Sequence, residues 1–322
     1  MDEQGRAGGG VRANFTEGRR CMNDNLNVVD TNSVQELIDK LQELSNENDP
    51  LKDKGWYFRG QADSTWKLLP SALRKDGKQL IKEIARVFND ELKNETNIYP
   101  HLRIAIGAYL WYLDKNDLHI DGYNNENKET YYYKDPKYPP RGVRYDWWNK
   151  NGIEPCFDHI ALAQHYGIPT TFLDWTRSYR KALFFAVNPE PPKDAKKIAV
   201  WAHFYDPEYR GEYHEFINPP RGNNTCLRAQ EGIFTLQNSV DVREGITFEN
   251  SKYFTDHVKI SDQNGHKHIE KYTLPVSEVE KLEAKLNEWG ITRETMFPEP
   301  YERIRAITKE FVEEIRKRTS KK

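Results

Sequence analysis

The sequence predicts a single α+β domain with a central mixed or antiparallel sheet flanked by helices. Short runs rich in aromatic and β-branched residues, typical of strands, alternate along the chain with stretches whose apolar residues recur every three or four positions, as in amphipathic helices. The 322 residues are 37% hydrophobic and 12% aromatic, which allows a substantial core. No internal repeat is visible, so a repeat architecture is not expected.

Two segments differ in composition from the rest of the chain. Most of residues 1–30 is glycine-rich and charged without a periodic apolar stripe, so we expect a disordered leader there and a folded domain over 31–322. Met22 is an alternative natural start. Residues 114–150 are polar and rich in tyrosine, which indicates an insertion. Its arginines and tryptophans could contact a nucleic acid, or its rings could simply clamp the insertion in place.

Four helices are predicted from apolar periodicity. The first spans 34–44 and is capped by Ser33 or by the asparagine before it. The second spans 80–92, and two more lie near the C-terminus, over 277–289 and 300–318.

Strands are predicted where aromatic or β-branched runs end at polar or glycine residues. An aromatic run leads to Arg59, which we expect to end its strand beside a glycine that allows close approach of another backbone or a ligand. An edge hairpin is expected from 258–260 and 268–274. The other predicted strands span 170–173, 198–204 and 230–236.

The most informative stretch runs from Leu162 to Val187. Gly167 stands where a helix needs a left-handed C-terminal residue, and Pro169 prevents that helix from continuing. A strand then leads to Asp174-Trp175-Thr176, and a second helix follows. Hydrogen-bonding side chains held between rigid elements are a common setting for functional sites.

Three separated motifs of this chain resemble the FRG domain family. They are Phe58-Arg59-Gly60 followed by Gln61, the segment from Gln164 to Thr176, and Ala229 to Thr235. All three occur in the family's order, and the resemblance extends from roughly Ser33 to about Ile307. One departure is Thr171, which stands where the family usually has arginine.

A more distant resemblance connects the chain with ADP-ribosyltransferases. Many of these enzymes have an aromatic-Arg-Gly strand, and later a Phe-Leu-Ser-Thr-Ser turn followed by a helix with Ala-x-x-Phe-Ala. Phe172 to Thr176, followed by Ala182 to Ala186, has the same layout. The resemblance implies an ADP-ribosyltransferase-like fold and NAD as the substrate.

The transferase resemblance implies roles for individual side chains. Arg59 would hold a phosphate of NAD through its planar fork, and Asp174 and Thr176 would bind ribose or the nicotinamide amide. Either Trp175 or Tyr57 could stack on a ring. The residues implied in cofactor binding are Tyr57, Phe58, Arg59, Gly60, Gln61 and Trp175.

The transferases normally end their site with a glutamate, and this chain departs from that pattern. Gly232 stands where the glutamate is expected, after Gln230 and Glu231. Three alternatives follow: Glu231 takes the role from a shifted position, Gln230 replaces it as a hydrogen-bonding group, or the site binds without turnover.

Each candidate residue also has a structural interpretation. Arg59 could pair with Asp174 and tie two strands together, and Asp174 could instead cap the following helix. His165 could be a general base, alone or with Asp174 in a hydrolase, or a histidine bonded within the helix terminus. No metal site is expected, because His159 and His165 are six residues apart and occupy different helix faces.

Bulk properties limit the partners and the compartment. The formal net charge is −2, so no global basic field points to nucleic acid. Three widely spaced cysteines, with no apolar segment long enough for a bilayer, lead us to expect a cytoplasmic protein without a membrane partner. The expected function is a toxin or antiviral-defence effector that modifies a protein or nucleic-acid acceptor, with a possible antitoxin-type partner. The alternative is a non-catalytic module that binds a nucleotide-like ligand or a protein partner.

Overall fold

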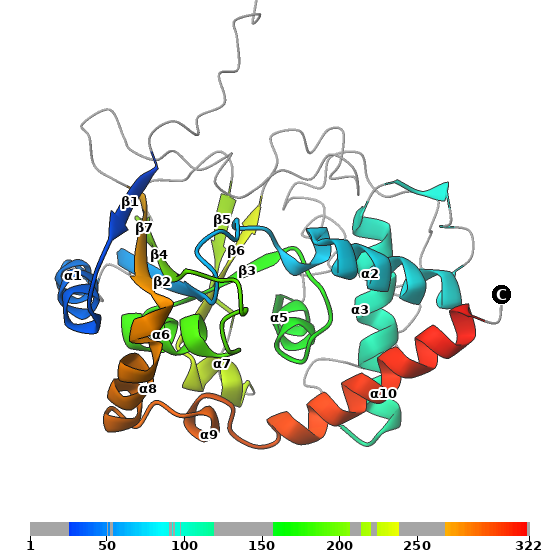
Figure 1. Ribbon diagram of the computed structural model, residues 1–322. Helices are drawn as coiled ribbons and strands as arrows, with labels where there is room; N and C mark the ends of the chain where they lie inside the picture. The colour runs from blue at the N-terminus through cyan, green and yellow to red at the C-terminus, as the bar shows by residue number, and fades with distance from the viewer. Residues whose placement is uncertain are drawn as a thin grey trace, which may run out of the picture.

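The computed structural model describes residues 26–49, 51, 54–89, 92, 94–96, 98–118, 157–206, 214–219, 224–237 and 268–320. Figure 1 shows a sheet with helices α1, α6 and α8 beside it, and a helical part made of α2, α3 and α10 next to it. Helix α5 lies between the two parts, so segments far apart in sequence meet around it.

Within these residues, seven strands form one sheet in the order β1-β7-β4-β2-β3-β6-β5. The pair β1–β7 is parallel and the other pairs are antiparallel, which confirms the predicted mixed sheet. The strands are β1 (Asn27–Asp30), β2 (Gly55–Gln61), β3 (Phe172–Thr176), β4 (Lys197–Tyr205), β5 (His214–Ile217), β6 (Gly232–Gln237) and β7 (Ile269–Pro275).

The helices cover one face of the sheet and build the separate helical part. They are α1 (Val34–Asn46), α2 (Lys75–Phe88), α3 (Ile98–Lys115), α5 (Phe157–His165), α6 (Tyr179–Val187), α7 (Thr225–Ala229), α8 (Val279–Glu288), α9 (Arg293–Met296) and α10 (Tyr301–Thr319). Short 3₁₀ turns span Ser71–Leu73, before α2, and Val276–Glu278, before α8.

Local signals in the sequence set several of these boundaries. The Glu36 amide donates to Ser33 Oγ at 3.2 Å, so Ser33 caps α1 as predicted. Gly167 has φ of 103°, the left-handed conformation expected after α5. The four predicted helices exist with shifted ends.

Several strand predictions need correction. Asn27–Asp30, placed in the leader, forms β1 by pairing with β7, because a four-residue strand carries too little periodicity to be recognised. Strand β7 lies between β1 and β4 and is therefore not an edge strand. Residues 258–260 lie outside the described part of the chain, as do 1–25 and 119–150. Of the expected insertion, residues 114 and 115 form the end of helix α3, and residues 116–118 form the turn after it.

Two hydrophobic clusters account for most of the described core. One joins α2, α3 and α10, where Tyr109 is fully buried and its hydroxyl lies 2.8 Å from Thr308 Oγ1. The other lies between the sheet and α1, α6 and α8, and contains Phe58 and Leu183. Phe172, Leu173 and Ala186 are buried as expected, whereas Phe185 is only partly buried.

Gly60 sets the distance between β2 and α6. A Cβ at this position would lie 2.0 Å from the Ala182 carbonyl oxygen and 2.4 Å from the Ala186 nitrogen. The close approach expected beside Arg59 is therefore made by the backbone of α6.

Candidate functional site

Arg59 and Asp174 meet where β2 and β3 separate. The two strands pair through a single register position, Phe58 with Thr176. Beyond it, Arg59 Nη1 donates to the Asp174 carbonyl oxygen at 2.7 Å and to Oδ2 at 3.1 Å. The guanidinium thus satisfies a strand carbonyl on the side where β3 has no further pairing with β2. The structural interpretation of Arg59, a tie between two strands, is confirmed.

The position of both residues differs from the expectation. Arg59 does not end β2, which continues to Gln61, and Asp174 lies within β3 and not after it. Asp174 is not a helix cap, because the N-cap of α6 is Ser178. The side chain of Arg59 is 15% exposed and that of Asp174 is 49% exposed, so the carboxylate remains accessible to solvent.

The second oxygen of Asp174 is bound by Gln164, a partner that sequence reasoning did not identify. Gln164 Nε2 donates to Asp174 Oδ1, and Gln164 Oε1 accepts from Thr170 Oγ1. The Thr170 amide in turn donates to Ser71 Oγ at 3.0 Å. This relay connects α5, β3 and the turn before α2. The sequence signals for Gln164 were its place just before the helix terminus and its position as the first residue of the second family motif.

A second arginine lies close to the pair. Taken over all its atoms, Arg74 is exposed to solvent. Its Nε donates to the Leu69 carbonyl oxygen at 3.0 Å. The pKa of its guanidinium is lowered, first by burial and then by the charge of Arg59, while Asp174 acts in the opposite direction. The charges of Arg59 and Asp174 therefore both act on Arg74, while Arg59 forms the ion pair with Asp174. In addition, Arg59 Nε is buried and has no hydrogen-bond partner among the described residues.

Thr176 and Gln230 are close together, but both are engaged. Thr176 Oγ1 donates to the Gln230 carbonyl oxygen at 2.7 Å and accepts from the Ser178 amide at 3.1 Å. Gln230 is buried and donates from Nε2 to the Met296 carbonyl oxygen at 3.1 Å. Gln230 caps the C-terminus of α7 and precedes β6, which corrects the prediction that the strand begins there.

Glu231 occupies the turn between α7 and β6. Its φ of 49° lies in the left-handed region, and its amide donates to the Arg228 carbonyl oxygen at 3.1 Å, at the end of α7. These two local features fix the backbone of Glu231. Oε1 lies 2.7 Å from Lys181 Nζ on α6, and the Glu231 side chain is 45% exposed. Lys181 Nζ also donates to the Ala229 carbonyl oxygen. The sequence did not point to Lys181 as a partner of this carboxylate.

The aromatic residues proposed to stack on a ligand are buried. Tyr57 is 3% exposed and packs against Tyr205 and Phe216. Trp175 is 2% exposed, and its Nε1 donates to Thr235 Oγ1 at 2.9 Å. Neither ring presents a free face to solvent, so the stacking role has no support in this conformation.

Two further residues of the 57–61 segment are also built into the core. Phe58 is fully buried beside Tyr179, and Gln61 accepts from Trp201 Nε1 at 2.7 Å. Within 57–61, Arg59 is therefore the residue whose side chain contacts Asp174.

His165 lies at the end of α5, with its ring centroid 6.0 Å from that of Phe234. Its Nε2 is enclosed and finds no hydrogen-bond partner in the described part of the chain. Burial lowers the pKa of His165, and the charge of Asp174 opposes the shift. The imidazole is therefore neutral near pH 7, a form that can accept a proton.

The described residues form neither a metal site nor a membrane-spanning helix. In the described ranges, no group of three or more His, Cys, Asp or Glu side chains is placed to hold a metal ion. No helix in those ranges is both long and apolar enough to cross a bilayer. Cys226 is buried, and burial raises the pKa of its thiol to about 11.

The family model of the FRG domain matches residues 123–195. The matched range includes α5, β3 and α6, and with them Gln164, His165 and Asp174. The motifs at 58–60 and 229–235 lie outside it. No curated protein and no solved structure matches the chain. The chain therefore contains an FRG domain.

Proposed function

We propose that the protein is an NAD-dependent ADP-ribosyltransferase whose nucleotide site is formed by Arg59, Arg74 and Asp174. One observation carries the proposal: Arg59 Nε is buried without an acceptor among the described residues, beside the ion pair of Arg59 with Asp174, and the charges of this pair act on Arg74. An unsatisfied buried donor is costly, and a pyrophosphate oxygen would satisfy it while balancing the positive charge. Arg59 also stands in the aromatic-Arg-Gly motif that such transferases use.

The proposed reaction breaks the bond between C1′ of the ribose and the nicotinamide nitrogen. The bonding electron pair leaves with nicotinamide, which becomes neutral, and C1′ passes through an oxocarbenium-like state. An acceptor lone pair then forms the new bond at C1′, and the acceptor loses a proton to a base or to water. Asp174 and Glu231 are 49% and 45% exposed carboxylates that could stabilise the developing positive charge.

Glu231 is the residue proposed to grip the ribose from its shifted position. Its carboxylate is paired with Lys181 at 2.7 Å, and this pair must open or turn for the carboxylate to reach a sugar hydroxyl. Because the pair is partly exposed, its opening costs about 0–1 kcal/mol. Such an enzyme would act as a toxin or antiviral-defence effector, and an antitoxin-type partner would hold it inactive.

The second candidate is a module that binds a nucleotide-like ligand without turnover. It is favoured by the engagement of Glu231 with Lys181 and by the burial of Tyr57 and Trp175. A hydrolase that uses His165 with Asp174 has less support. The two oxygens of Asp174 accept from Arg59 and Gln164, which orients the carboxylate toward these partners.

The test measures NAD binding by calorimetry and nicotinamide release by chromatography on the same protein. Arg59→Lys should weaken NAD binding about tenfold or more, because the planar fork is lost while the charge remains. Glu231→Gln should retain binding and lose nicotinamide release. The matched control is Arg318→Lys, at the exposed end of α10.

The outcomes separate the candidates. Nicotinamide release by the unaltered protein, lost in Glu231→Gln, supports the transferase. Binding without release in the unaltered protein supports the binding module. If NAD does not bind at millimolar concentration, or if Arg59→Lys and Arg318→Lys bind equally well, the proposed nucleotide site is rejected.

A further inference from the structure

The turn between α7 and β6 is fixed by the segment that follows β3. Three successive carbonyl oxygens of the turn each accept a hydrogen bond from this segment. The donors are Lys181 Nζ to Ala229, Thr176 Oγ1 to Gln230 at 2.7 Å, and the Arg177 amide to Glu231 at 3.2 Å. Because backbone carbonyls are costly to leave without donors, the turn cannot shift without losing several bonds at once.

Helix α6, which carries Lys181, is fixed as well. Its backbone lies so close to β2 that a Cβ on Gly60 would be 2.0 Å from the Ala182 carbonyl oxygen. Figure 1 shows α6 and α7 next to each other beside the sheet, and the bond from Lys181 to Ala229 joins them. Lys181 therefore connects a rigid helix to a rigid turn, which is the kind of support that a precise binding site needs.

The Lys181 ammonium group has two acceptors and one remaining donor. Nζ donates to the Ala229 carbonyl oxygen and to Glu231 Oε1, the latter at 2.7 Å. A lysine ammonium carries three N–H donors, so one N–H has no acceptor among the described residues. The side chain is only 18% exposed, and its two bonds restrict the position of this third donor.

The Glu231 carboxylate has one engaged oxygen and one open oxygen. Lys181 binds Oε1, whereas Oε2 has no hydrogen bond within the described part of the chain, and the side chain is 45% exposed. The φ of 49° at Glu231 is unfavourable for a residue other than glycine, and such conformations are frequent at functional sites. An open acceptor and an open donor thus lie side by side on one ion pair.

Two other Lys–Glu pairs of the described chain are built differently. They are Lys281–Glu278 and Lys285–Glu288. Each joins residues three positions apart, and the lysines are 70% and 37% exposed. Exposed pairs of this kind are readily replaced by water. The pair of Lys181 with Glu231 differs because it joins distant segments and its lysine has a second acceptor in the backbone.

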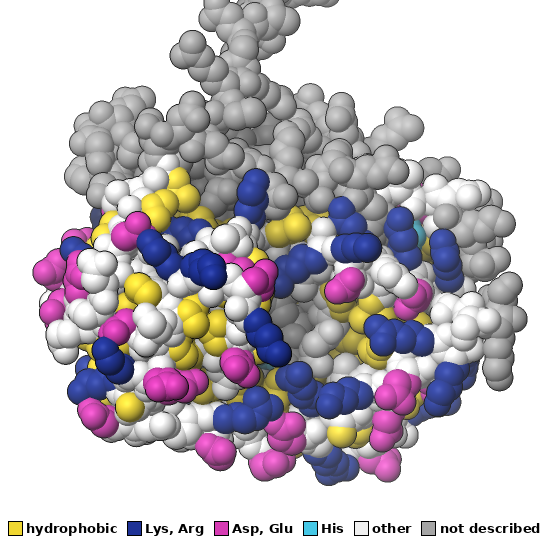
Figure 2. Space-filling model, in the orientation of Figure 1, with side chains coloured by type: hydrophobic (Ala, Val, Ile, Leu, Met, Phe, Trp, Pro, Cys, Tyr) yellow, Lys and Arg dark blue, Asp and Glu magenta, His cyan; other side chains and the backbone are white. Residues whose placement is uncertain are grey.

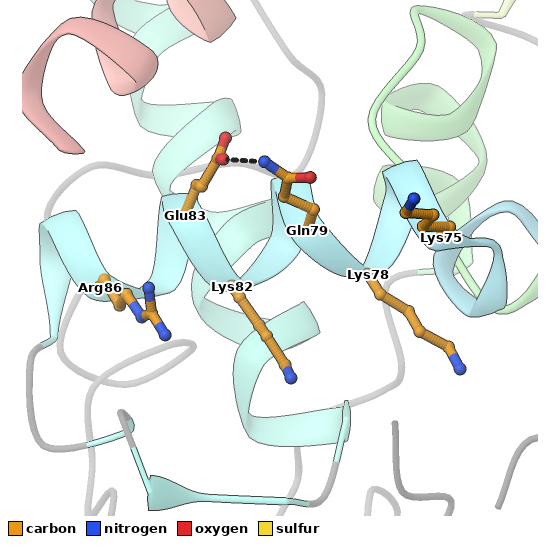
Figure 3. A pocket seen from close by; sticks show the side chains of 6 residues that line it. All are labelled: Lys75, Lys78, Gln79, Lys82, Glu83 and Arg86. Carbon is orange, nitrogen blue, oxygen red and sulfur yellow. Dashed lines mark hydrogen bonds between the residues drawn. The ribbon is translucent and has the colours of Figure 1, made fainter. Parts of the chain in front are cut away.

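The open hollow of about 410 Å³ along α2 does not offer this arrangement. Its glutamate, Glu83, accepts from Gln79 Nε2 at 2.8 Å, and Figure 3 shows Lys78 and Lys82 projecting to another side of the helix. In Figure 2, Lys and Arg side chains are spread over much of the described face. Charge alone therefore does not single out one place for a ligand, whereas a fixed donor beside a fixed acceptor does.

We propose that the Lys181–Glu231 pair binds two neighbouring hydroxyl groups of a sugar. One hydroxyl donates to Glu231 Oε2, and the other accepts from the third N–H of Lys181. The 2- and 3-hydroxyls of a ribose are such neighbours. A turn of the carboxylate about its bond with Lys181 brings Oε2 to the sugar, so the ion pair stays closed. The choice of the ribose that carries nicotinamide rests on the proposed transferase function, whereas recognition of the diol does not.

The test uses carba-NAD, in which a methylene group replaces the ring oxygen of the nicotinamide ribose and prevents nicotinamide release. Calorimetry on the full chain compares it with analogues that lack the 2- or the 3-hydroxyl of that ring. Loss of either hydroxyl should weaken binding about tenfold or more, because a group built to bond it is left without a partner. An analogue without the 2-hydroxyl of the adenosine ribose should bind like carba-NAD.

Variants of Lys181 separate positioning from general stability. Lys181→Met should weaken carba-NAD binding about tenfold and reduce its preference over the two ring-deoxy analogues to about twofold or less. Lys181→Arg keeps the charge, can reach both acceptors, and should restore most of the preference. The matched control is Lys285→Met, which removes an ion pair of the same 2.7 Å length and should change neither quantity. If Lys181→Met does not unfold cooperatively, Lys181→Gln takes its place, because its amide can still donate to Ala229.

A merely structural role of Lys181 would lower the melting temperature and weaken all probes alike. An unchanged preference in Lys181→Met therefore overturns the inference. Equal binding of carba-NAD and its ring-deoxy analogues by the unaltered protein overturns it too, as does the absence of binding at millimolar concentration.

The proposed function has its own readout in nicotinamide release from NAD. A hydroxyl preference that depends on Lys181, without release, supports the diol site and rejects the transferase. Release without this preference leaves the transferase and rejects the diol site.

Discussion

Removal of the Arg59 guanidinium should destabilise the protein moderately and leave it folded. Arg59→Ala deletes two hydrogen bonds made by the same nitrogen, one to the Asp174 carbonyl oxygen at 2.7 Å and one to Oδ2 at 3.1 Å. A fully buried carboxylate stranded in this way would cost several kcal/mol. The Asp174 side chain is 49% exposed, so water replaces the lost partner.

The magnitude follows from these two contacts. A hydrogen bond from a charged donor to the strand carbonyl contributes about 1.5–3 kcal/mol. The bond to the half-exposed carboxylate adds about 0–1 kcal/mol because solvent screens it. Arg59→Ala should therefore lower the free energy of unfolding by about 2–3 kcal/mol. Arg59→Lys keeps the charge and reaches one oxygen, so its cost should be about half as large.

The assay is thermal and urea unfolding of Arg59→Ala, Arg59→Lys and Asp174→Asn, together with the Arg59→Ala/Asp174→Asn double variant. For a chain of this length, about 2–3 kcal/mol corresponds to a fall in Tm of about 3–4 °C. The double variant should cost less than the sum of the single variants, because the partners are in contact. The control is Arg318→Ala, which breaks an exposed pair with Glu314 and should cost about 0–1 kcal/mol. A fall in Tm of less than about 1 °C for Arg59→Ala would contradict the tie between β2 and β3. A double-variant cost equal to the sum of the two single-variant costs would contradict it as well.

Four other substitutions test packing and titration. Gly60→Ala should cost about 3 kcal/mol or more in urea unfolding, because its Cβ would lie 2.0 Å from the Ala182 carbonyl oxygen; an unchanged midpoint would show that α6 can move away. Phe184→Ala should cost about 3–5 kcal/mol, and Phe185→Ala clearly less, because Phe184 is 5% exposed while Phe185 is only partly buried; equal costs would contradict that ranking. His165 has a lowered pKa in the folded protein, so the unfolded state binds its proton first and stability should fall as pH drops below 6.5. Unfolding of His165→Gln should lose this pH dependence, and a slope equal to that of the unaltered protein would show that another group titrates.

The sequence determined features that depend on neighbouring residues in the chain. The cap at Ser33 and the left-handed turn at Gly167 need only a side-chain oxygen or a missing Cβ at one position. Apolar periodicity was sufficient for the four predicted helices, since their buried faces repeat within each segment. The need for close approach at Gly60 was also visible, although its partner, the backbone of α6, was not.

Tertiary structure decided which side chains meet. Arg59 and Asp174 are 115 residues apart, and their contact exists because β2 and β3 separate after one paired position. Gln164 binds Asp174 only because α5 lies beside β3, and the packing of α2 brings Arg74 within range of the charges of Arg59 and Asp174. The aromatic residues Tyr57 and Trp175 could have faced a ligand or the core with the same local sequence. Burial depends on what the rest of the chain places over a strand, so only the assembled sheet shows that both rings belong to the core and that Arg59 reaches the carboxylate.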